Sequence, residues 1–333
     1  MERQRPHYWR GNGNGGKSVS NPPFIERGGE LVARPPFLQE NTHLRCFFLE
    51  AKQEKLQAMC DQVFNAPSGG IFSFRPFSNI VLLTFAKIEL IYSLHGNDAE
   101  RGGMPEIDVA FWVPMLYERE GRLQLAWYNP YIFVDNPYAM ATGREGFGFP
   151  KTLAQFQIPG QKTSTDPYWV KTLAMERFRS DSISQEMRVV EVIRTRHAQP
   201  PLQQLATVQS LIAMLTGENE NFSTRVVLGL QNLQKMIATR EIQMVFLRQL
   251  RDIHDPTVAA YQEIIEAPTR VARLHRVGVL DGVFEVRLPT NASFPIAEDL
   301  GLQVDRNPVK GAYWMDFDFF LDVGKTLWKT GDV

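Results

Sequence analysis

One segment of the sequence combines residue types that could carry out nucleophilic chemistry. Residues 143–151 read GREGFGFPK and end in Lys151. Glycine allows tight or positive-φ backbone conformations, and proline fixes φ and removes one backbone donor. We therefore expect a shaped loop that presents Lys151 from an apolar collar formed by Phe147 and Phe149. The glycine order is not that of a dinucleotide-binding fingerprint, and no βαβ pattern surrounds it.

A lysine attacks a carbonyl carbon only as the uncharged amine. An ordinary lysine has a pKa of about 10.4, and lowering it to about 7 costs roughly 4.6 kcal/mol against the charged form. Full burial can supply such a shift, and a nearby cation adds to it. We expect Phe147, Phe149 and Leu153 to desolvate Lys151, and Arg144 to repel its charge. The alternative is an ordinary solvated lysine that follows a turn.

Two carboxylates could serve as acid–base groups. Residues 106–115 alternate in character, so Glu106, Asp108, Ala110 and Trp112 share one face of a predicted strand. This face joins two carboxylates to an aromatic side chain. Either carboxylate could exchange a proton with a substrate, and the alternative is that both lie at the solvent end of the strand.

The lysine segment, G-R-E-x-x-G-F-P-K-x-L, resembles the active-site segment of the acetoacetate decarboxylase family. The resemblance implies that Lys151 forms a Schiff base with a keto acid. Acetoacetate decarboxylase is itself a known case of a lysine activated by desolvation or by a second cation. In the decarboxylases proper a second lysine follows at once, whereas this chain has Thr152. Burial would therefore carry more of the activation here.

The resemblance covers about residues 30–329, with support from segments 108–114, 261–271 and 316–329. It implies that a carboxylate near the lysine falls at Asp108, with Glu106 two residues earlier, and either could be the acid–base group.

Two charged positions of the family differ in this chain. A family arginine aligns near Thr42, with Arg45 three residues on, and a family glutamate aligns near Ala86, with Glu89 the nearest acid. Together with Thr152, these departures set the chain apart from decarboxylases that act on acetoacetate.

The composition is that of a globular protein with a sizeable core, since the 333 residues are 44% hydrophobic and 11% aromatic. The formal net charge of −1 gives no basic excess for nucleic acid or a membrane surface. No apolar run approaches the roughly 18 residues of a membrane span, and the start of the chain has no apolar signal core. We expect a cytoplasmic protein. Six scattered histidines and two cysteines, Cys46 and Cys60, predict no metal site.

The elements that position these groups are mostly strands. Strand-like runs separated by turns dominate up to residue 195, which favours an α+β fold built on a mainly antiparallel sheet or partly closed β-barrel with peripheral helices. We predict a mobile arm over residues 1–28 and a single domain over 29–333. Helices are predicted at 51–64, in an insertion at about 202–238, and at 316–329. The apolar face of the last helix would comprise Phe317, Phe320, Leu321, Gly324, Leu327 and Trp328.

Three functions are consistent with these residues. The first is a cofactor-independent carbon–carbon lyase in which Lys151 attacks a β-keto acid, carbon dioxide leaves, and Glu106 or Asp108 returns a proton. The second is an aldolase, dehydratase or cyclase that uses the same lysine on another keto acid. The third is a non-catalytic small-molecule binder or assembly subunit. For the enzymes we expect Arg144, Phe147, Phe149 and Trp112 to contact the keto acid. The resemblance also implies a homo-oligomer.

Overall fold

Runs of β-branched and aromatic residues make strands the main element of the chain. The computed structural model describes residues 23–25, 32–160, 164–196 and 241–331. The strands are β1 Phe37–Glu50, β2 Arg75–Pro76, β3 Ile80–Ser93, β4 Gly103–Arg119, β5 Arg122–Val134, β6 Lys151–Leu153, β7 Gln155–Gln157, β8 Tyr168–Ala174, β9 Gln185–Arg196, β10 Glu241–Arg251, β11 Ala259–Val279, β12 Val283–Arg287, β13 Asn307–Pro308, β14 Gly311–Leu321 and β15 Lys325–Lys329. The helices are α1 Gln53–Cys60, η1 Asp61–Asn65, η2 Gly96–Glu100, α2 Pro137–Thr142, η3 Gly143–Phe147 and α5 Ile296–Leu300.

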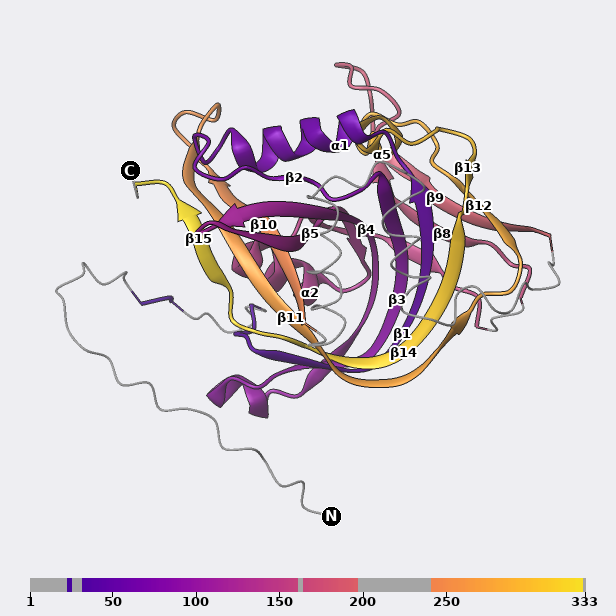
Figure 1. Cartoon of the computed structure of the whole chain (residues 1–333), viewed down its shortest axis with the longest axis horizontal. Coiled ribbons are helices and arrows are strands. Elements are labelled where there is room, and N and C mark those ends of the chain that lie inside the picture. The colour runs from indigo at the N-terminus through magenta and orange to yellow at the C-terminus, as the bar shows by residue number, and fades with distance from the viewer. Residues whose placement is uncertain (1–22, 26–31, 161–163, 197–240, 332–333) are drawn as a thin grey trace, which may run out of the picture. The chain divides into compact units, whose positions relative to one another are not determined.

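The large sheet curves into a ring (Figure 1). Its strands run in the order β4, β3, β1, β14, β11, β10 and β5, and β5 pairs back onto β4. The pairings are antiparallel except between β10 and β5, where Met244 lies opposite Trp127, and between β5 and β6. Because one joint rests on a single pair, the ring is a partly closed barrel, and the predicted fold class is confirmed.

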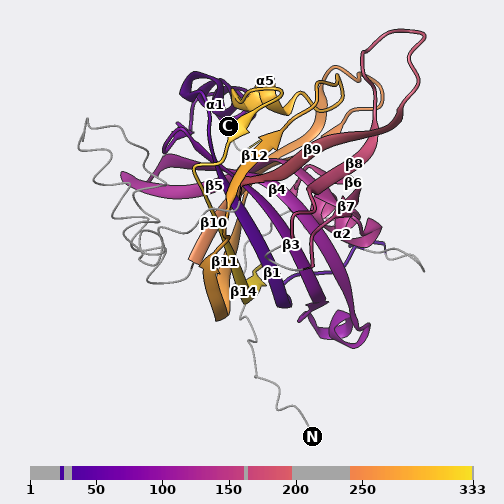
Figure 2. The ribbon, with the colours of Figure 1, turned by 90° about the vertical axis from the view of Figure 1, so that its right-hand side faces the viewer.

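A second sheet, in the order β13, β12, β9, β8 and β7, covers the outer face of β1 and β3 (Figure 2). The two sheets meet through aromatic rings, since Phe47 packs edge-on against both Tyr168 and Phe284 at centroid distances of 5.3 Å. Strands buried on both faces need apolar residues at successive positions, which accounts for the nearly continuous apolar run of β3. Helix α1 lies across one end of the ring beside α5 (Figure 1).

The predicted helix over residues 316–329 is wrong, because this segment forms β14 and β15. The sequence DFDFFLD alternates with a period of two, so Phe317, Phe319 and Leu321 all point to the inside of the ring. Strand β5 runs on through Asn129 and Pro130, and a register shift opposite Phe111–Val113 absorbs this pair.

Contacts within the chain divide it into Met1–Glu30 and Leu31–Val333, and all the elements named above lie in the second unit. The predicted helix at 51–64 corresponds to α1 and η1. Apart from residues 23–25, the predicted arm lies outside the described residues, as does the predicted insertion, and both stay predictions. None of the helices in the described ranges is long and apolar enough to cross a membrane.

Candidate active site

A cavity of about 150 Å³ lies inside the ring of strands. On the basis of 10–15 Å³ for each water, this is space for on the order of ten water molecules, enough for a small metabolite. Its lining comes mainly from apolar side chains of β1, β3, β4, β10, β11 and β14. The polar lining residues, apart from Trp112, are Gln39, Thr42, Thr84, Glu106, Asp108, Asn129, Thr142, Lys151 and Thr269. Of the described residues that line the cavity, only Lys151 is a cation.

The three predicted catalytic residues lie together in this cavity. The Lys151 Nζ atom is 2.6 Å from the Glu106 Oε1 atom and 3.9 Å from the Asp108 Oδ2 atom. The Lys151 and Glu106 side chains are almost fully buried, at 9% and 3% exposed, and the Asp108 side chain is 22% exposed. Alternation along β4 turns both carboxylates inward, and the parallel pairing of Lys151 with Ile132 of β5 places the amine opposite them.

The loop before Lys151 is a helical turn that ends sharply. The Asn136 side chain caps α2 by accepting hydrogen bonds from the Tyr138 and Ala139 amides. The helix continues through η3 and ends at Gly148, which has φ +75°. A Cβ atom on Gly148 would lie 2.6 Å from the Arg248 Cα atom of β10, so glycine is required both for the conformation and for the close approach.

Gly143 makes room for the lysine side chain. A Cβ atom at this position would lie 2.8 Å from the Lys151 Cδ atom and 3.2 Å from a ring atom of Phe149. A methyl group would therefore displace the stem of the lysine or the ring beside it.

The predicted aromatic collar is present in part. Phe147 and Phe149 are 2% and 7% exposed, and their rings stack at 5.0 Å between centroids. The Lys151 Nζ atom lies 5.9 Å from the centroid of the Phe149 ring, within the range of a cation–π contact. Leu153 is 42% exposed, so its predicted part in desolvating the lysine is wrong.

Arg144 lies on the outside of the loop. It is exposed, and its Nη1 atom donates a hydrogen bond to the Lys151 carbonyl at 3.1 Å. It is not among the residues that line the cavity. The guanidinium therefore supports the backbone of the loop, while the predicted repulsion of the amine finds no support in this geometry.

The charge state of Lys151 differs from the sequence-based expectation. Burial lowers the pKa of the lysine, but the carboxylates of Glu106 and Asp108 together raise the pKa above its ordinary value. The resting amine is therefore an ammonium paired with Glu106, and burial alone does not make it nucleophilic. The expectation of a lysine pKa near 7 is wrong, because it considered the apolar collar without the distances to the two acids.

Asp108 is the group that titrates near neutral pH. Burial raises the pKa of its carboxyl, Lys151 lowers it, and Glu106 and Asp135 raise it further, to about 7. Asp108 is thus protonated in a large fraction of molecules at neutral pH. It is poised to donate a proton, as a general acid at this pH must be.

The resembled family has charged residues at two positions that are Thr42 and Ala86 in this chain. The charged residues nearest to these positions point away from the cavity. Thr42 and Ala86 line it. Arg45 lies on the opposite face of β1 and hydrogen-bonds Tyr168, and Glu89 is 48% exposed and pairs with His43 at 3.5 Å.

Trp112 completes the polar part of the β4 wall. Its Nε1 atom donates to the Thr84 hydroxyl at 2.9 Å, and that hydroxyl donates to the Ala110 carbonyl at 3.3 Å. The indole is thus held in place and offers its ring to the cavity. In the described part of the chain, no three His, Cys, Asp or Glu side chains gather to hold a metal ion, and the absence of a metal stays a prediction.

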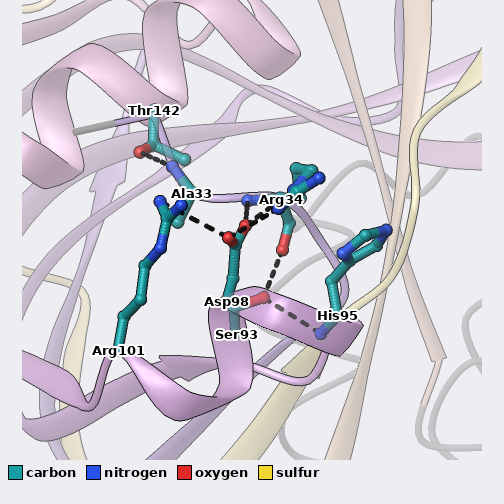
Figure 3. A network of polar contacts seen from close by, with 7 residues as sticks. All are labelled: Ala33, Arg34, Ser93, His95, Asp98, Arg101 and Thr142. Carbon is teal, nitrogen blue, oxygen red and sulfur yellow. Dashed lines mark hydrogen bonds and ion pairs between the residues drawn. The ribbon is translucent and has the colours of Figure 1, made fainter. Parts of the chain in front are cut away.

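One end of the cavity is fastened by a network of polar contacts (Figure 3). The Ala33 amide donates to the hydroxyl of Thr142, a lining residue, at 3.1 Å. Arg34 donates to Asp98 through its backbone amide, Nε and Nη2 at 2.8–2.9 Å. The hydrogen bonds from Arg34 hold the pKa of Asp98 at about 2, although burial raises it. These contacts fix the segment that leads into β1 beside α2.

Several residues that line the cavity were not predicted from the sequence. Strands β10, β11 and β14 contribute Ile242, Met244, Phe246, Thr269, Phe317 and Phe319. The alternation in β14 was the available signal, and it was hidden by the helical interpretation of that segment.

The comparisons with known proteins agree with this architecture. No protein-family model and no curated protein sequence matches the chain. Among solved structures, an acetoacetate decarboxylase from Legionella pneumophila is similar with a TM-score of 0.59 and 13% identity, over 92% of each chain. An acetoacetate decarboxylase-like enzyme from Sphingomonas wittichii RW1 is similar with a TM-score of 0.53 and 12% identity, over 92% of this chain and 98% of that one.

A further similar structure is that of MppR, an enduracididine biosynthesis enzyme, in complex with the condensation product of pyruvate and imidazole 4-carboxaldehyde. The TM-score is 0.50 at 13% identity, over 90% of this chain and 92% of that one. At this level of identity the likenesses show the fold, which is that of acetoacetate decarboxylase and enzymes similar to it.

Proposed function

We propose that the protein is a cofactor-independent lyase in which Lys151 forms a Schiff base with a small carbonyl compound. The reaction that the site supports best is the decarboxylation of a β-keto acid. The observation that carries the proposal is a buried amine that faces a cavity at 2.6 Å from one carboxylate and 3.9 Å from a second.

The first step is release of the amine from its ion pair. A proton moves from the Lys151 ammonium to the Glu106 carboxylate across the short hydrogen bond, which leaves a neutral amine and a neutral acid. An apolar cavity lowers the cost of this transfer relative to water, because both charged groups lose their hydration there. Binding of a substrate that expels water lowers the cost further.

The amine then attacks the carbonyl carbon to give a carbinolamine. The hydroxyl group leaves and takes the proton from Glu106 to form water, so the products are an iminium ion on Lys151 and the Glu106 carboxylate. The bond between the α-carbon and the carboxylate carbon breaks, its electron pair flows toward the iminium nitrogen, and carbon dioxide and an enamine result. Asp108 protonates the enamine carbon, and water hydrolyses the new iminium to release the ketone.

Two features favour loss of the carboxylate. The lone cation of the described lining is consumed as the nucleophile, so no second cation of the lining stabilises the substrate carboxylate. An anion placed against apolar side chains and two acids is destabilised, and its departure as neutral carbon dioxide relieves this.

Aldol-type condensation is the second candidate. It is supported by the likeness to MppR, whose structure holds a condensation product of pyruvate. Asp108 could serve it as well, by removing a proton from the carbon beside the iminium.

Borohydride trapping tests the proposal. The wild-type protein and Lys151→Ala are incubated with acetoacetate or with pyruvate, reduced, and digested, and the adduct is located by peptide mass. An adduct on Lys151 together with release of carbon dioxide supports decarboxylation. An adduct without carbon dioxide from any β-keto acid supports the second candidate. No adduct with any keto acid or ketone contradicts Schiff-base chemistry and leaves a non-catalytic binder.

A further inference from the structure

The wall of the cavity formed by β1 holds two buried polar atoms with nothing to bond to. The Thr42 hydroxyl and the Gln39 Oε1 atom have no hydrogen-bond partner among the described residues. Thr42 is 0% and Gln39 is 8% exposed, and both line the cavity. Native proteins pair nearly all buried polar side-chain atoms, because an unpaired one costs about 1–3 kcal/mol.

A β-bulge turns these two side chains to the same side. Residues three apart on a regular strand face opposite ways. Here the register of β1 against β14 shifts between Gln39, opposite Phe319, and Thr42, opposite Phe317. Asn41 absorbs the irregularity with φ 54°, and its amide donates to Asp318 at 2.9 Å. Bulges of this kind re-aim side chains beside functional sites.

The neighbours of the pair cannot supply a hydrogen bond. On the inner face Thr42 lies between Phe317 of β14 and Ile88 of β3, and Gln39 lies between Phe319 and Ile91. All four neighbours line the cavity with apolar side chains. Because both residues line the cavity and the described residues offer them no partner, either polar atom can bond a molecule held in the cavity.

The pair lies across the cavity wall from the lysine. Thr42 pairs with Ile88, which pairs with Glu106, so two strand spacings, roughly 10 Å, separate Thr42 from the acid that holds Lys151. A hydrogen bond takes about 2.8 Å of this span. A chain of several atoms therefore fits between an imine on Lys151 and the Thr42 hydroxyl.

We propose that Gln39 and Thr42 determine specificity by binding an uncharged polar group, such as a hydroxyl, at the end of the substrate remote from its carbonyl. This rests on the proposed Schiff-base function and names its substrate class. A remote carboxylate does not suit this wall, because the described lining there holds no cation. A remote methyl group leaves both polar atoms unpaired. Acetoacetate, which has no remote polar group, is therefore a poor substrate.

The test compares matched ketones. One series is methyl ketones that end in a hydroxyl, from hydroxybutanone to hydroxyheptanone, and the other replaces the hydroxyl with a methyl group. The concentration for half-maximal borohydride adduct on Lys151 is measured for each. At the chain length that reaches Thr42, the half-maximal concentration of the hydroxy ketone should be about five- to tenfold lower than that of the matched methyl compound. This is the effect of about one hydrogen bond.

Variants assign the effect to the two residues. Thr42→Val and Gln39→Met should each reduce the hydroxy-to-methyl ratio toward one while adducts with methyl ketones persist. Thr42→Val should unfold at the same temperature or higher, since it removes an unpaired buried hydroxyl, whereas a structural threonine would lose stability. Thr172→Val is the matched control, because Thr172 is buried outside the cavity lining and its hydroxyl donates to the Leu153 carbonyl at 2.6 Å, and it should leave the ratio unchanged.

The outcomes are separable from those of the proposed function. Equal trapping of both series at every length in the wild type overturns the inference, because water then suffices as the partner. A ratio that survives in the Thr42→Val, Gln39→Met double variant also overturns it. If no ketone is trapped, the proposed Schiff-base chemistry is wrong, and the inference about Gln39 and Thr42 is then tested by calorimetric binding of the same ketones to Lys151→Met. Binding of the hydroxy ketone that is about fivefold or more tighter than that of its methyl counterpart supports the role of Gln39 and Thr42, and equal binding refutes it.

Discussion

Asp98 and Asp108 lie ten positions apart in the sequence, and the structure gives them opposite properties. Asp98 is 2% exposed and receives three hydrogen bonds from Arg34, with Arg101 at 3.5 Å. Arg34 holds the pKa of Asp98 at about 2. Asp108 has Lys151 at 3.9 Å, and that lysine is closer to Glu106. Burial raises the pKa of Asp108 to about 7.

The difference shows that burial of an acid does not by itself decide its role. A guanidinium keeps its charge and offers several donors in a fixed plane, so its carboxylate stays ionised. An ammonium shared between two carboxylates satisfies neither fully and can give up its proton. The Arg34–Asp98 pair fastens the chain, while we propose that the Lys151–Glu106–Asp108 group exchanges protons.

Replacing Lys151 with arginine should make the Lys151–Glu106–Asp108 group resemble the Arg34–Asp98 pair. In Lys151→Arg the charge remains, the nucleophile is lost, and imine formation should fall by more than about 1,000-fold, to background. The pKa of Asp108 should also fall, because a guanidinium offers several donors in a fixed plane and can hydrogen-bond a carboxylate that the ammonium approaches only to 3.9 Å. Borohydride trapping and carboxyl titration by NMR measure the two effects. Persistent adduct at position 151 or elsewhere in the cavity would refute the assignment.

Asp108→Asn should remove the proton donor while leaving the lysine in place. We expect turnover to drop by about 100-fold or more, with imine trapping retained. In the wild type, turnover should decline as pH rises through about 7, because the donor loses its proton, and the variant should lack this decline. A pH profile of turnover measures both, and an unchanged profile would identify Glu106 as the donor.

The same substitution should change how stability depends on pH. Because the folded pKa of Asp108 lies above the ordinary value, the folded state binds more protons than the unfolded state between about pH 4 and 7. Wild-type stability relative to Asp108→Asn should therefore decrease as pH rises through this window, by up to about 4 kcal/mol. Urea unfolding at several pH values provides the measurement.

Gly143→Ala tests whether the lysine needs its present position. The added methyl group would lie 2.8 Å from the Lys151 Cδ atom, so the amine must shift away from Glu106. We expect about tenfold slower imine formation with little change in far-ultraviolet circular dichroism. Gly146→Ala is the control, since nothing lies within 4 Å of its would-be Cβ atom. Equal rates in the two variants would show that the stem tolerates displacement.

Asp98→Asn should have the smallest effect on the chemistry. It weakens the contacts with Arg34 and should lower stability by about 1–3 kcal/mol, with the rate of imine formation per folded molecule unchanged. Because the pKa of Asp98 is held at about 2, the contribution it makes is present above pH 4 and is lost as pH falls toward 2. Thermal unfolding at pH 7 and pH 3 checks this, and a slower imine rate would mean that the Asp98 network also orders the cavity.

Much of the site could be predicted from local patterns. The period of two along β4 placed Glu106, Asp108 and Trp112 on one face, and the glycine–phenylalanine loop marked Lys151. The sign of the lysine's pKa shift could not be predicted, because it depends on distances between strands that are far apart in the sequence. The bulge that aligns Gln39 with Thr42 is likewise set by the pairing with β14.

The joint between β5 and β10 has a consequence for which part of the ring opens first. It is held by one parallel pair, Met244 opposite Trp127, while β6, which carries Lys151, occupies the other end of the same edge of β5. A seam with so few backbone hydrogen bonds parts locally at far lower free energy than the whole domain unfolds. We therefore expect the amides flanking this seam to exchange with solvent ahead of the rest of the ring.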